Sequence, residues 1–236
     1  MDQKEYALIV AGGKGTRIKS SLPKQFILLN GKPLLLHTLE AFNRYSPALP
    51  IVLVLPENDI DTWKVMAEEF DYRQPLILQA GGDTRFQSVK RGLEKIGGSG
   101  LVAIHDGVRP LVSRNIIDAS FRLAAVRRTA VAAVRLKESI RMTEQSSLQG
   151  SISTLQDKSQ AVDRSRYLLI QTPQTFDLDL IRSAYQIKED PYLTDDASVA
   201  ERAGYSISLF EGSYDNIKIT TPEDVIIAEA LLKKKS

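Results

Sequence analysis

The chain has 236 residues, of which 43% are hydrophobic and 25% are charged, as is usual for a globular protein with a full core. The formal net charge of +2 is too small to indicate binding to nucleic acid or to a membrane surface. The absence of cysteine excludes disulfides, thiol catalysis and cysteine-ligated metals. No apolar stretch reaches the ~18 residues that span a bilayer, and residues 1–5 lack the apolar part of a signal peptide, so a cytoplasmic protein is expected.

Strand-like and helix-like segments alternate along the chain. Strands are predicted for the apolar runs at residues 6–11, 51–55, 76–79, 101–105, 130–134 and 206–210. Helices are predicted at residues 33–45, 61–70, 85–96 and 114–128, and a last helix begins at residues 220–224 with a threonine cap, a proline and early acids. The strands are continuously apolar, which favours burial on both faces. We therefore predict an α/β fold for a single catalytic domain over residues 1–236, with a mostly parallel sheet and flanking helices.

The first predicted strand leads into a loop that is rich in glycine. Residues 10–17 read VAGGKGTR. Glycine lets the backbone turn close to a ligand, successive amides of such a turn hold phosphate oxygens, and Arg17 and Lys24 add positive charge. The loop lacks the P-loop spacing, and Ile18 stands where the dinucleotide pattern needs its third glycine. An ordinary glycine turn with solvated basic residues is the alternative, but the stiff Pro23 beside Lys24 favours a nucleoside triphosphate site.

Three more polar clusters follow later predicted strands, at residues 81–88, 105–110 and 213–218. Ligands of open α/β sheets bind at the carboxyl ends of the strands, so the four loops are expected to form one site. Asp106 ends an apolar strand and fits a Mg²⁺ ligand, because hard oxygen suits a metal that carries phosphate. An Asx turn or a helix cap is the alternative for this aspartate.

The sequence shows no nucleophile paired with a base. Cysteine and the G-x-S-x-G motif are absent, and we interpret His37 and His105 as structural residues. Any chemistry is therefore expected to depend on positioning and charge neutralisation, as in nucleotidyl transfer. Singly, each basic residue suits a solvated surface, but together around one cleft they would need an anionic ligand. The basic residues in question are Arg17, Lys24, Arg109, Arg164 and Lys218.

The alternation of strands and helices breaks at residues 135–166. Polar residues dominate there, and short β-prone pieces at residues 139–142 and 165–170 flank them. Long segments without secondary structure are uncommon in compact domains and tend to be functional. We predict that residues 135–166 form a projecting β-arm, with a plain loop as the alternative.

In chain order, these motifs resemble the signature of the 2-C-methyl-D-erythritol 4-phosphate cytidylyltransferases. The matching stretches are residues 11–17, 23–26, 81–89, 105–110, 171–174, 194–198 and 216–224. The resemblance implies a Rossmann-like nucleotide-diphosphosugar transferase fold, Mg²⁺ as cofactor and a homodimer that exchanges its arms for dimerisation. It implies that CTP and 2-C-methyl-D-erythritol 4-phosphate give 4-diphosphocytidyl-2-C-methyl-D-erythritol and pyrophosphate, one reaction of non-mevalonate isoprenoid precursor synthesis.

The resemblance also implies roles for single residues. The implied catalytic residues are Arg17, Lys24 and Lys218, and Asp106 would hold Mg²⁺. The implied substrate-binding residues are Ala11, Gly12, Gly13, Gly15, Gly82, Asp83, Ser88, Gly107, Arg109, Ser139, Arg164, Thr172 and Thr194. Of these, the residues that would read the cytosine are Gly82, Asp83 and Ser88. Those that would reach methylerythritol phosphate from the neighbouring subunit's side are Arg109, Ser139 and Arg164.

The chain departs from the usual pattern of the family at a few positions. Ile18 replaces a common methionine, Gly107 and Val108 replace two alanines, and Ser139 aligns where threonine is common. Two other functions stay open, namely a cytidylyltransferase acting on ribitol 5-phosphate and a catalytically silent nucleotide-binding module. Residues 194–198 favour the methylerythritol type over the ribitol type, and the intact basic residues argue against a silent module.

Overall fold

The computed structural model describes residues 3–12, 22–143 and 159–235. The predicted site residues Gly13, Gly15 and Arg17 lie outside this described part of the chain.

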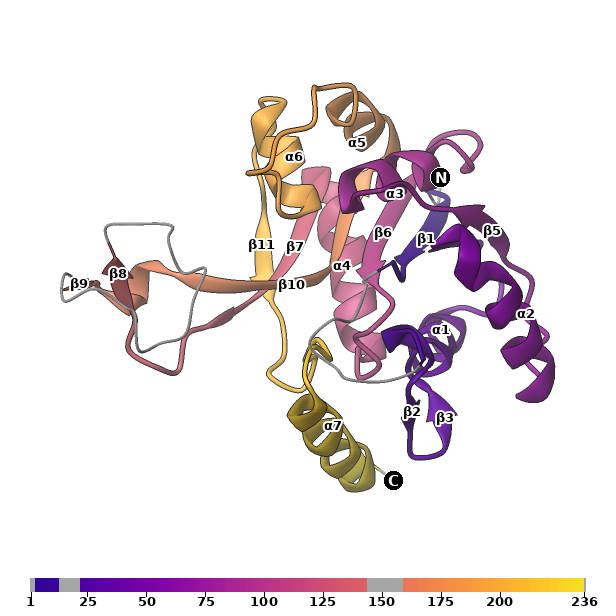
Figure 1. Cartoon of the computed structure of the whole chain (residues 1–236). Coiled ribbons are helices and arrows are strands. Elements are labelled where there is room, and N and C mark those ends of the chain that lie inside the picture. The colour runs from indigo at the N-terminus through magenta and orange to yellow at the C-terminus, as the bar shows by residue number, and fades with distance from the viewer. Residues whose placement is uncertain (1–2, 13–21, 144–158, 236) are drawn as a thin grey trace.

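Within the described residues, seven strands form the central sheet in the order β11–β7–β10–β6–β1–β4–β5 (Figure 1). The strands are β1 (Glu5–Val10), β4 (Ile51–Leu55), β5 (Ile77–Ala80), β6 (Leu101–Asp106), β7 (Thr129–Arg135), β10 (Leu168–Asp177) and β11 (Leu209–Glu211). In this sheet β10 runs antiparallel to both β6 and β7, while the other neighbouring pairs are parallel. The mostly parallel sheet predicted from the sequence is therefore confirmed.

Helices cover both faces of this sheet. They are α1 (Leu34–Tyr45), α2 (Ile60–Glu69), α3 (Arg85–Leu93), α4 (Arg114–Arg127), α5 (Leu178–Ala184) and α6 (Asp196–Arg202). The last helix, α7 (Pro222–Lys235), packs beside β2 instead. Short strands β2 (Leu28–Leu29) and β3 (Lys32–Pro33) form a hairpin before α1, and the short 3-10 helices are η1 (Lys24–Phe26), η2 (Glu57–Asp59) and η4 (Arg164–Arg166). Side-chain caps begin several helices, because a polar side chain can accept the otherwise unpaired first amides. Thr84 caps α3, Ser113 caps α4, and Asp195 forms a capping box with Ser198 at α6.

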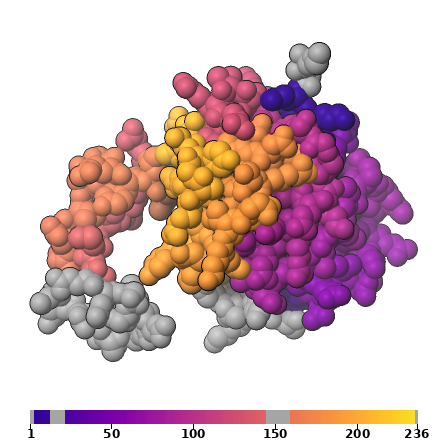
Figure 2. Space-filling model, turned by 90° about the horizontal axis from the view of Figure 1, so that it is seen from above, coloured from indigo at the N-terminus to yellow at the C-terminus, as the bar shows by residue number. Residues whose placement is uncertain are grey.

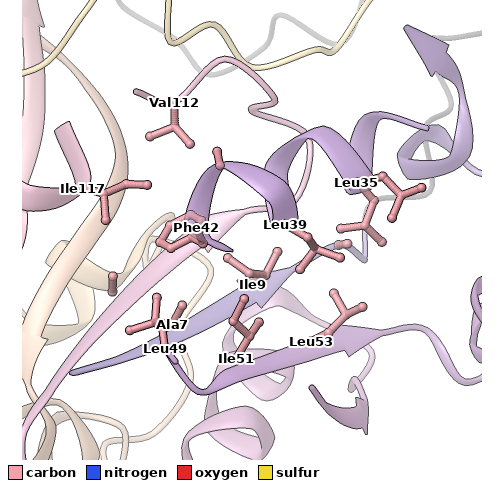
Figure 3. Close-up of a cluster of buried hydrophobic side chains, with 14 of the residues drawn as sticks. Ala7, Ile9, Leu35, Leu39, Phe42, Leu49, Ile51, Leu53, Val112 and Ile117 are labelled. Carbon is pink, nitrogen blue, oxygen red and sulfur yellow. The ribbon is translucent and has the colours of Figure 1, made fainter. Parts of the chain in front are cut away.

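Alternate residues of β1 face the two helical layers. Ala7 and Ile9 pack with α1, α2 and α4, whereas Leu8 and Val10 pack with α3, α5 and α6. Figure 3 shows Ile9 beneath Leu39 of α1, with Phe42 of the same helix beside it. Full burial of one such side chain contributes about 1.5–3 kcal/mol. The apolar runs that predict the strands thus become the two-sided core that holds the carboxyl ends of β1 and β6 in place.

The described part of the predicted arm leaves the body of the molecule from β7 and returns through β10. In it, β8 (Arg141–Thr143) pairs antiparallel with β9 (Ser159–Ala161). Figures 1 and 2 show this part of the chain standing off the body of the domain. At its base, residues 167–170 include Tyr167 and Leu169, which are 46% and 52% exposed.

The described residues contain no helix with the length and apolar character that crossing a membrane requires.

Candidate active site

Asp106, the last residue of β6, lies at the centre of a cluster of positive charge. Among the described residues, Lys218 Nζ lies 3.1 Å from Asp106 Oδ2, and Arg109 Nε lies 3.1 Å from the same oxygen. Arg85 Nε lies 3.9 Å from Asp106 Oδ1. These cations come from the start of α3, from the loop after β6 and from the segment before α7. Loops that are far apart in the sequence therefore meet at the carboxyl end of β6.

The charges around Asp106 decide its protonation state. Burial by itself raises the pKa of the carboxyl, since it disfavours the charged form. The nearby charges of Lys218, Arg85 and Arg109 outweigh burial and hold the pKa of Asp106 well below its usual range. Asp106 is therefore ionised at neutral pH, and the cluster carries more positive than negative charge, as a phosphate site needs.

A cleft of about 520 Å³ opens beside this cluster. Its lining includes Arg85, Asp106, Arg109, Thr172, Thr194 and Lys218. A volume of this size is in the range of small-molecule sites. Predicted residues from four parts of the chain, Asp106 with Arg109, Thr172, Thr194 and Lys218, thus share one cavity.

Buried hydrogen bonds fix the wall of this cleft. Asn216 Nδ2 donates to the carbonyl of Thr172 at 2.8 Å, and Arg109 Nη1 donates to the carbonyl of Asn216 at 2.9 Å. Pro173 follows Thr172 and has no amide to donate, and the pairing of β10 with β7 shifts register between Ile170 and Gln174. This interruption of the ladder leaves Gln171 and Thr172 free to bond sideways to the segment that carries Lys218.

His105 lies completely buried behind the cleft wall. Its Nδ1 lies 3.0 Å from Thr172 Oγ1, and its Nε2 lies 3.4 Å from the carbonyl oxygen of Arg109. Burial lowers the pKa of His105 to about 3, because an imidazolium there would lose its hydration. The ring is thus neutral at physiological pH and bonded to the cleft, in keeping with the structural role predicted for it.

This burial predicts a pH-dependent stability. The unfolded chain takes up a proton at His105 near pH 6.5, whereas the folded chain does so only near pH 3, so stability is lost as the pH falls between these values. From pH 7 to pH 5 the loss attributable to His105 is expected to be about 2 kcal/mol. Urea unfolding at both pH values, for the wild type and for His105→Phe, measures it. A wild-type loss no larger than that of the variant would contradict the prediction.

The turn at residues 82–88, predicted to bind the cytosine, is held by hydrogen bonds among its own residues. Ser88 Oγ accepts from the amide of Gly82 at 3.0 Å and donates to the carbonyl of Thr84 at 2.8 Å. The amide of Asp83 donates to Gln87 Oε1 at 3.1 Å. A Cβ on Gly82 would lie 2.4 Å from Gln87 Cβ, so this position needs glycine. The Ser88 hydroxyl therefore shapes the turn, while Asp83 stays exposed on its rim.

The ends of β1 and β6 meet closely where the glycine loop begins. The amide of Gly107 donates to the carbonyl of Val10 at 2.9 Å, and a Cβ on Gly107 would lie 2.7 Å from Ala11 Cβ. Gly12 follows with its residue exposed. Lys24 begins η1 and is partly buried. The predicted residues Ala11, Gly12, Gly107 and Lys24 do not line the 520 Å³ cleft.

Two predicted site residues lie on the arm instead. Ser139 and Arg164 are exposed, and Arg164 Nη1 donates to the carbonyl of Lys137 within the arm. Neither residue lines the cleft of its own chain. The structure therefore separates these two residues from the others within one subunit.

Several cleft residues were not predicted from the sequence. Arg85 makes a bidentate pair with Asp196 of α6, with Nη1–Oδ1 and Nη2–Oδ2 distances of 2.9 and 2.6 Å. Gln174 Nε2 donates to Asp195 Oδ2 at 2.8 Å and so ties β10 to the cap of α6. All four residues belong to stretches that carry the family resemblance, at residues 81–89, 171–174 and 194–198. The sequence does not show which of them pair, because the partners lie far apart along the chain.

Comparison with known proteins identifies the family. The sequence model of the 2-C-methyl-D-erythritol 4-phosphate cytidylyltransferases matches residues 6–234. The chain belongs to this family. A 2-C-methyl-D-erythritol 4-phosphate cytidylyltransferase of Bacteroides fragilis is 46% identical over 226 residues, covering 96% of this chain and 98% of that protein. One of Porphyromonas gingivalis is 44% identical over 234 residues, covering 98% of this chain and 99% of that protein.

Solved cytidylyltransferase structures also resemble this fold. The 4-diphosphocytidyl-2C-methyl-D-erythritol synthase of Anaerococcus prevotii superposes with a TM-score of 0.79 at 28% identity, covering 98% of this chain and 96% of that one. The enzyme of Thermus thermophilus gives a TM-score of 0.73 at 28% identity, covering 99% of this chain and 100% of that one. The predicted family, the Rossmann-like fold and the class of nucleotidyltransferase are therefore confirmed.

Proposed function

We propose that the chain transfers the cytidylyl group of CTP to 2-C-methyl-D-erythritol 4-phosphate. The names of its full-length relatives support this substrate pair. The structural observation that carries the proposal is the ionised Asp106 held among Arg85, Arg109 and Lys218 beside one cleft. We place the reaction in the cytoplasm, which the cysteine-free composition supports.

In the proposed reaction, an oxygen of the alcohol phosphate attacks the α-phosphorus of CTP. The bond from that phosphorus to the oxygen bridging the β-phosphorus breaks, and pyrophosphate leaves with the electron pair. Lys218 is partly exposed, with 41% of its side chain accessible, so it can reach from Asp106 toward a phosphate in the cleft. Fixed cations that meet the charge of the transition state lower the barrier, which is the role proposed for Lys218 together with Arg17 and Lys24.

We further propose Mg²⁺ as cofactor, with Asp106 as its protein ligand. The described residues contain no group of three or more His, Asp or Glu side chains that could hold a metal by themselves. Asp106 Oδ1 lies at the long distance of 3.9 Å from Arg85 Nε, and such a carboxylate oxygen fits a hard cation. Mg²⁺ is commonly held by one or two carboxylates, substrate phosphates and water. When bound, it would supply neutralisation of phosphate charge.

The test of the proposed function compares two alcohol phosphates. The full chain is incubated with CTP and Mg²⁺, and with either 2-C-methyl-D-erythritol 4-phosphate or ribitol 5-phosphate, and pyrophosphate release is measured. We expect turnover with the first substrate. Preferred turnover of ribitol 5-phosphate would overturn the assignment, and CTP binding without pyrophosphate release from either substrate would indicate a silent module.

We also propose a homodimer in which arms are exchanged. The exposed apolar base of the arm supports it, because Leu168, Leu169 and Ile170 are 40–52% exposed in a single subunit. Buried against a second subunit, such side chains favour association. The exchange would bring Ser139 and Arg164 to a partner's cleft, since neither lines its own.

Arm exchange predicts complementation between inactive variants. Arg164→Ala and Lys24→Ala subunits are each expected to be inactive as homodimers. A heterodimer of the two would contain one site with both residues intact, so part of the activity is expected to return on mixing. Turnover of mixed subunits measures this, with size and composition confirmed by mass spectrometry. Confirmed heterodimers without recovered activity would count against a shared site.

A further inference from the structure

A chain of hydrogen bonds joins β6 to β10 behind the cleft wall. The amide of Asp106 donates to Thr172 Oγ1 at 3.1 Å. The same oxygen lies 3.0 Å from His105 Nδ1, and His105 Nε2 lies 3.4 Å from the carbonyl oxygen of Arg109. The ring of Phe42 packs edge-on against the imidazole, with centroids 5.2 Å apart. His105 therefore contacts, through one fixed ring, the backbone of one cleft residue and the hydroxyl of another.

The chemistry of these groups determines where the protons lie. A carbonyl oxygen only accepts, so His105 Nε2 must carry the hydrogen that faces Arg109. In a neutral imidazole the other nitrogen, Nδ1, is then an acceptor, and the Thr172 hydroxyl donates to it. The opposite tautomer would set the lone pair of Nε2 against the lone pairs of the Arg109 carbonyl. Of the two neutral tautomers, only the Nε2–H form makes both hydrogen bonds.

We propose that His105 is a positioning residue for the alcohol-phosphate half of the site, acting through Thr172 and Arg109 as the Nε2–H tautomer. In this arrangement the Thr172 hydroxyl donates to His105 Nδ1 and accepts from the amide of Asp106, so the ring fixes the side chain of a residue that lines the cleft. This inference rests on the proposed function for the nature of the substrate, but the tautomer itself does not.

The tautomer is tested directly by nitrogen NMR. The chain has two histidines, His37 and His105, so a sample labelled with ¹⁵N-histidine gives two rings, and His37→Gln assigns them. We expect His105 to be neutral and protonated on Nε2 at pH 7 in the full chain without ligand. Protonation on Nδ1, or a charged ring, would overturn the inference. This measurement needs no turnover, so it stands even if the proposed reaction is wrong.

Kinetics test the positioning role. In His105→Phe, kcat/KM for methylerythritol phosphate is expected to fall roughly 10- to 100-fold, since small misplacements of substrate-positioning groups have effects of this size. The KM for CTP is expected to change less than about twofold, because the bonds lost lie at Thr172 and Arg109. His105→Asn keeps a group that can accept the Thr172 proton, so part of the loss is expected to return.

His37→Phe is the matched control. Nε2 of this half-buried histidine lies 2.8 Å from the carbonyl of Leu29, away from the cleft, and its loss is expected to leave both KM values unchanged. Equal losses for the two substrates, or no recovery in His105→Asn, would overturn the positioning role. If the wild type turns over neither alcohol phosphate, the proposed function fails, while the NMR result still decides the tautomer.

Discussion

Lys218→Ala is expected to lower kcat by roughly 100- to 1000-fold, about 2.7–4 kcal/mol, as removal of a single donor to a transition-state oxyanion does. Lys218 Nζ lies 3.1 Å from Asp106 Oδ2 and lines the cleft, so it stands where phosphate charge is proposed to develop. Its loss also leaves Asp106 with less compensating charge. Steady-state kcat and KM for CTP, measured separately, check the prediction, because a rise in KM alone would mean that Lys218 holds only the ground state.

A matched surface pair controls for the loss of a lysine–aspartate contact. Lys64 Nζ lies 2.8 Å from Asp61 Oδ1 on an exposed turn of α2. Lys64→Ala removes the same kind of pair far from Asp106, and exposed pairs contribute only about 0–1 kcal/mol. Its kcat is expected to equal that of the wild type. Similar kinetic losses in the two variants would show that the Lys218 effect is not a property of the site.

Asp196→Asn is expected to destabilise the fold by about 3 kcal/mol, because removing one partner of a buried ion pair leaves the other charge uncompensated. The side chain of Asp196 is completely buried, and it accepts two bonds from Arg85 and one from the Tyr185 hydroxyl at 2.6 Å. Burial and the nearby Asp196 charge raise the pKa of Tyr185 well above its usual value, so this phenol stays a donor. The free energy of unfolding in urea measures the loss.

Asp118→Asn provides the comparison for this variant. Arg122 Nη2 lies 2.7 Å from Asp118 Oδ2, nearly the same distance as in the buried pair, but 74% of the Arg122 side chain is exposed. The expected loss is about 0.3–0.5 kcal/mol, as for exposed pairs one helical turn apart. Equal losses in the free energy of unfolding would contradict the prediction, because they would mean that water hydrates the Arg85 guanidinium when Asp196 no longer compensates its charge.

The strands predicted best from the sequence are those buried on both faces. Continuous apolar runs locate β1, β4 and β6 within a residue or two, because such a run in this composition has few alternatives to a covered sheet. The edge strand β11 is different. Residues 206–210 were predicted, but the strand is Leu209–Glu211, because Thr129 Oγ1 donates to the carbonyl of Ser206 and accepts from the amide of Ser208. At residues 206–208 the Thr129 side chain therefore makes hydrogen bonds that a neighbouring strand would otherwise make.

Polarity hides β10 and the two short helices that follow it. The middle of β10 carries Gln171, Thr172 and Gln174, whose hydrogen-bond partners Asn216 and Asp195 come from distant parts of the sequence. The helices α5 and α6 have only seven residues each, too few to show a helical period. Buried polar groups need partners from distant parts of the chain, and a local pattern does not contain those partners.

Among the site residues, too, those marked by local sequence are predicted and those that depend on distant partners are not. Asp106 and Lys218 were predicted from their places after apolar strands, and the structure brings them within hydrogen-bond distance. Arg85 lies in a stretch that carries the family resemblance, but the local sequence assigns it no role, because its partner Asp196 is 111 residues away. The predicted roles themselves, for these residues and for Gly13, Gly15 and Arg17 outside the described chain, stay predictions.

A single strand carries both the base of the arm and the wall of the cleft. The first three residues of β10, Leu168 to Ile170, are exposed, and Thr172 follows only two positions later with its oxygen bonded to β6. Leu168 and Thr172 are four positions apart on one strand, and β10 pairs with β7 up to Ile170, where the ladder is interrupted. In the proposed homodimer, a partner packed on Leu168–Ile170 would therefore border the segment that carries Thr172. If the proposed homodimer holds, activity is expected to fall when the protein is diluted until its subunits separate, even though every residue of the cleft wall named above belongs to one polypeptide.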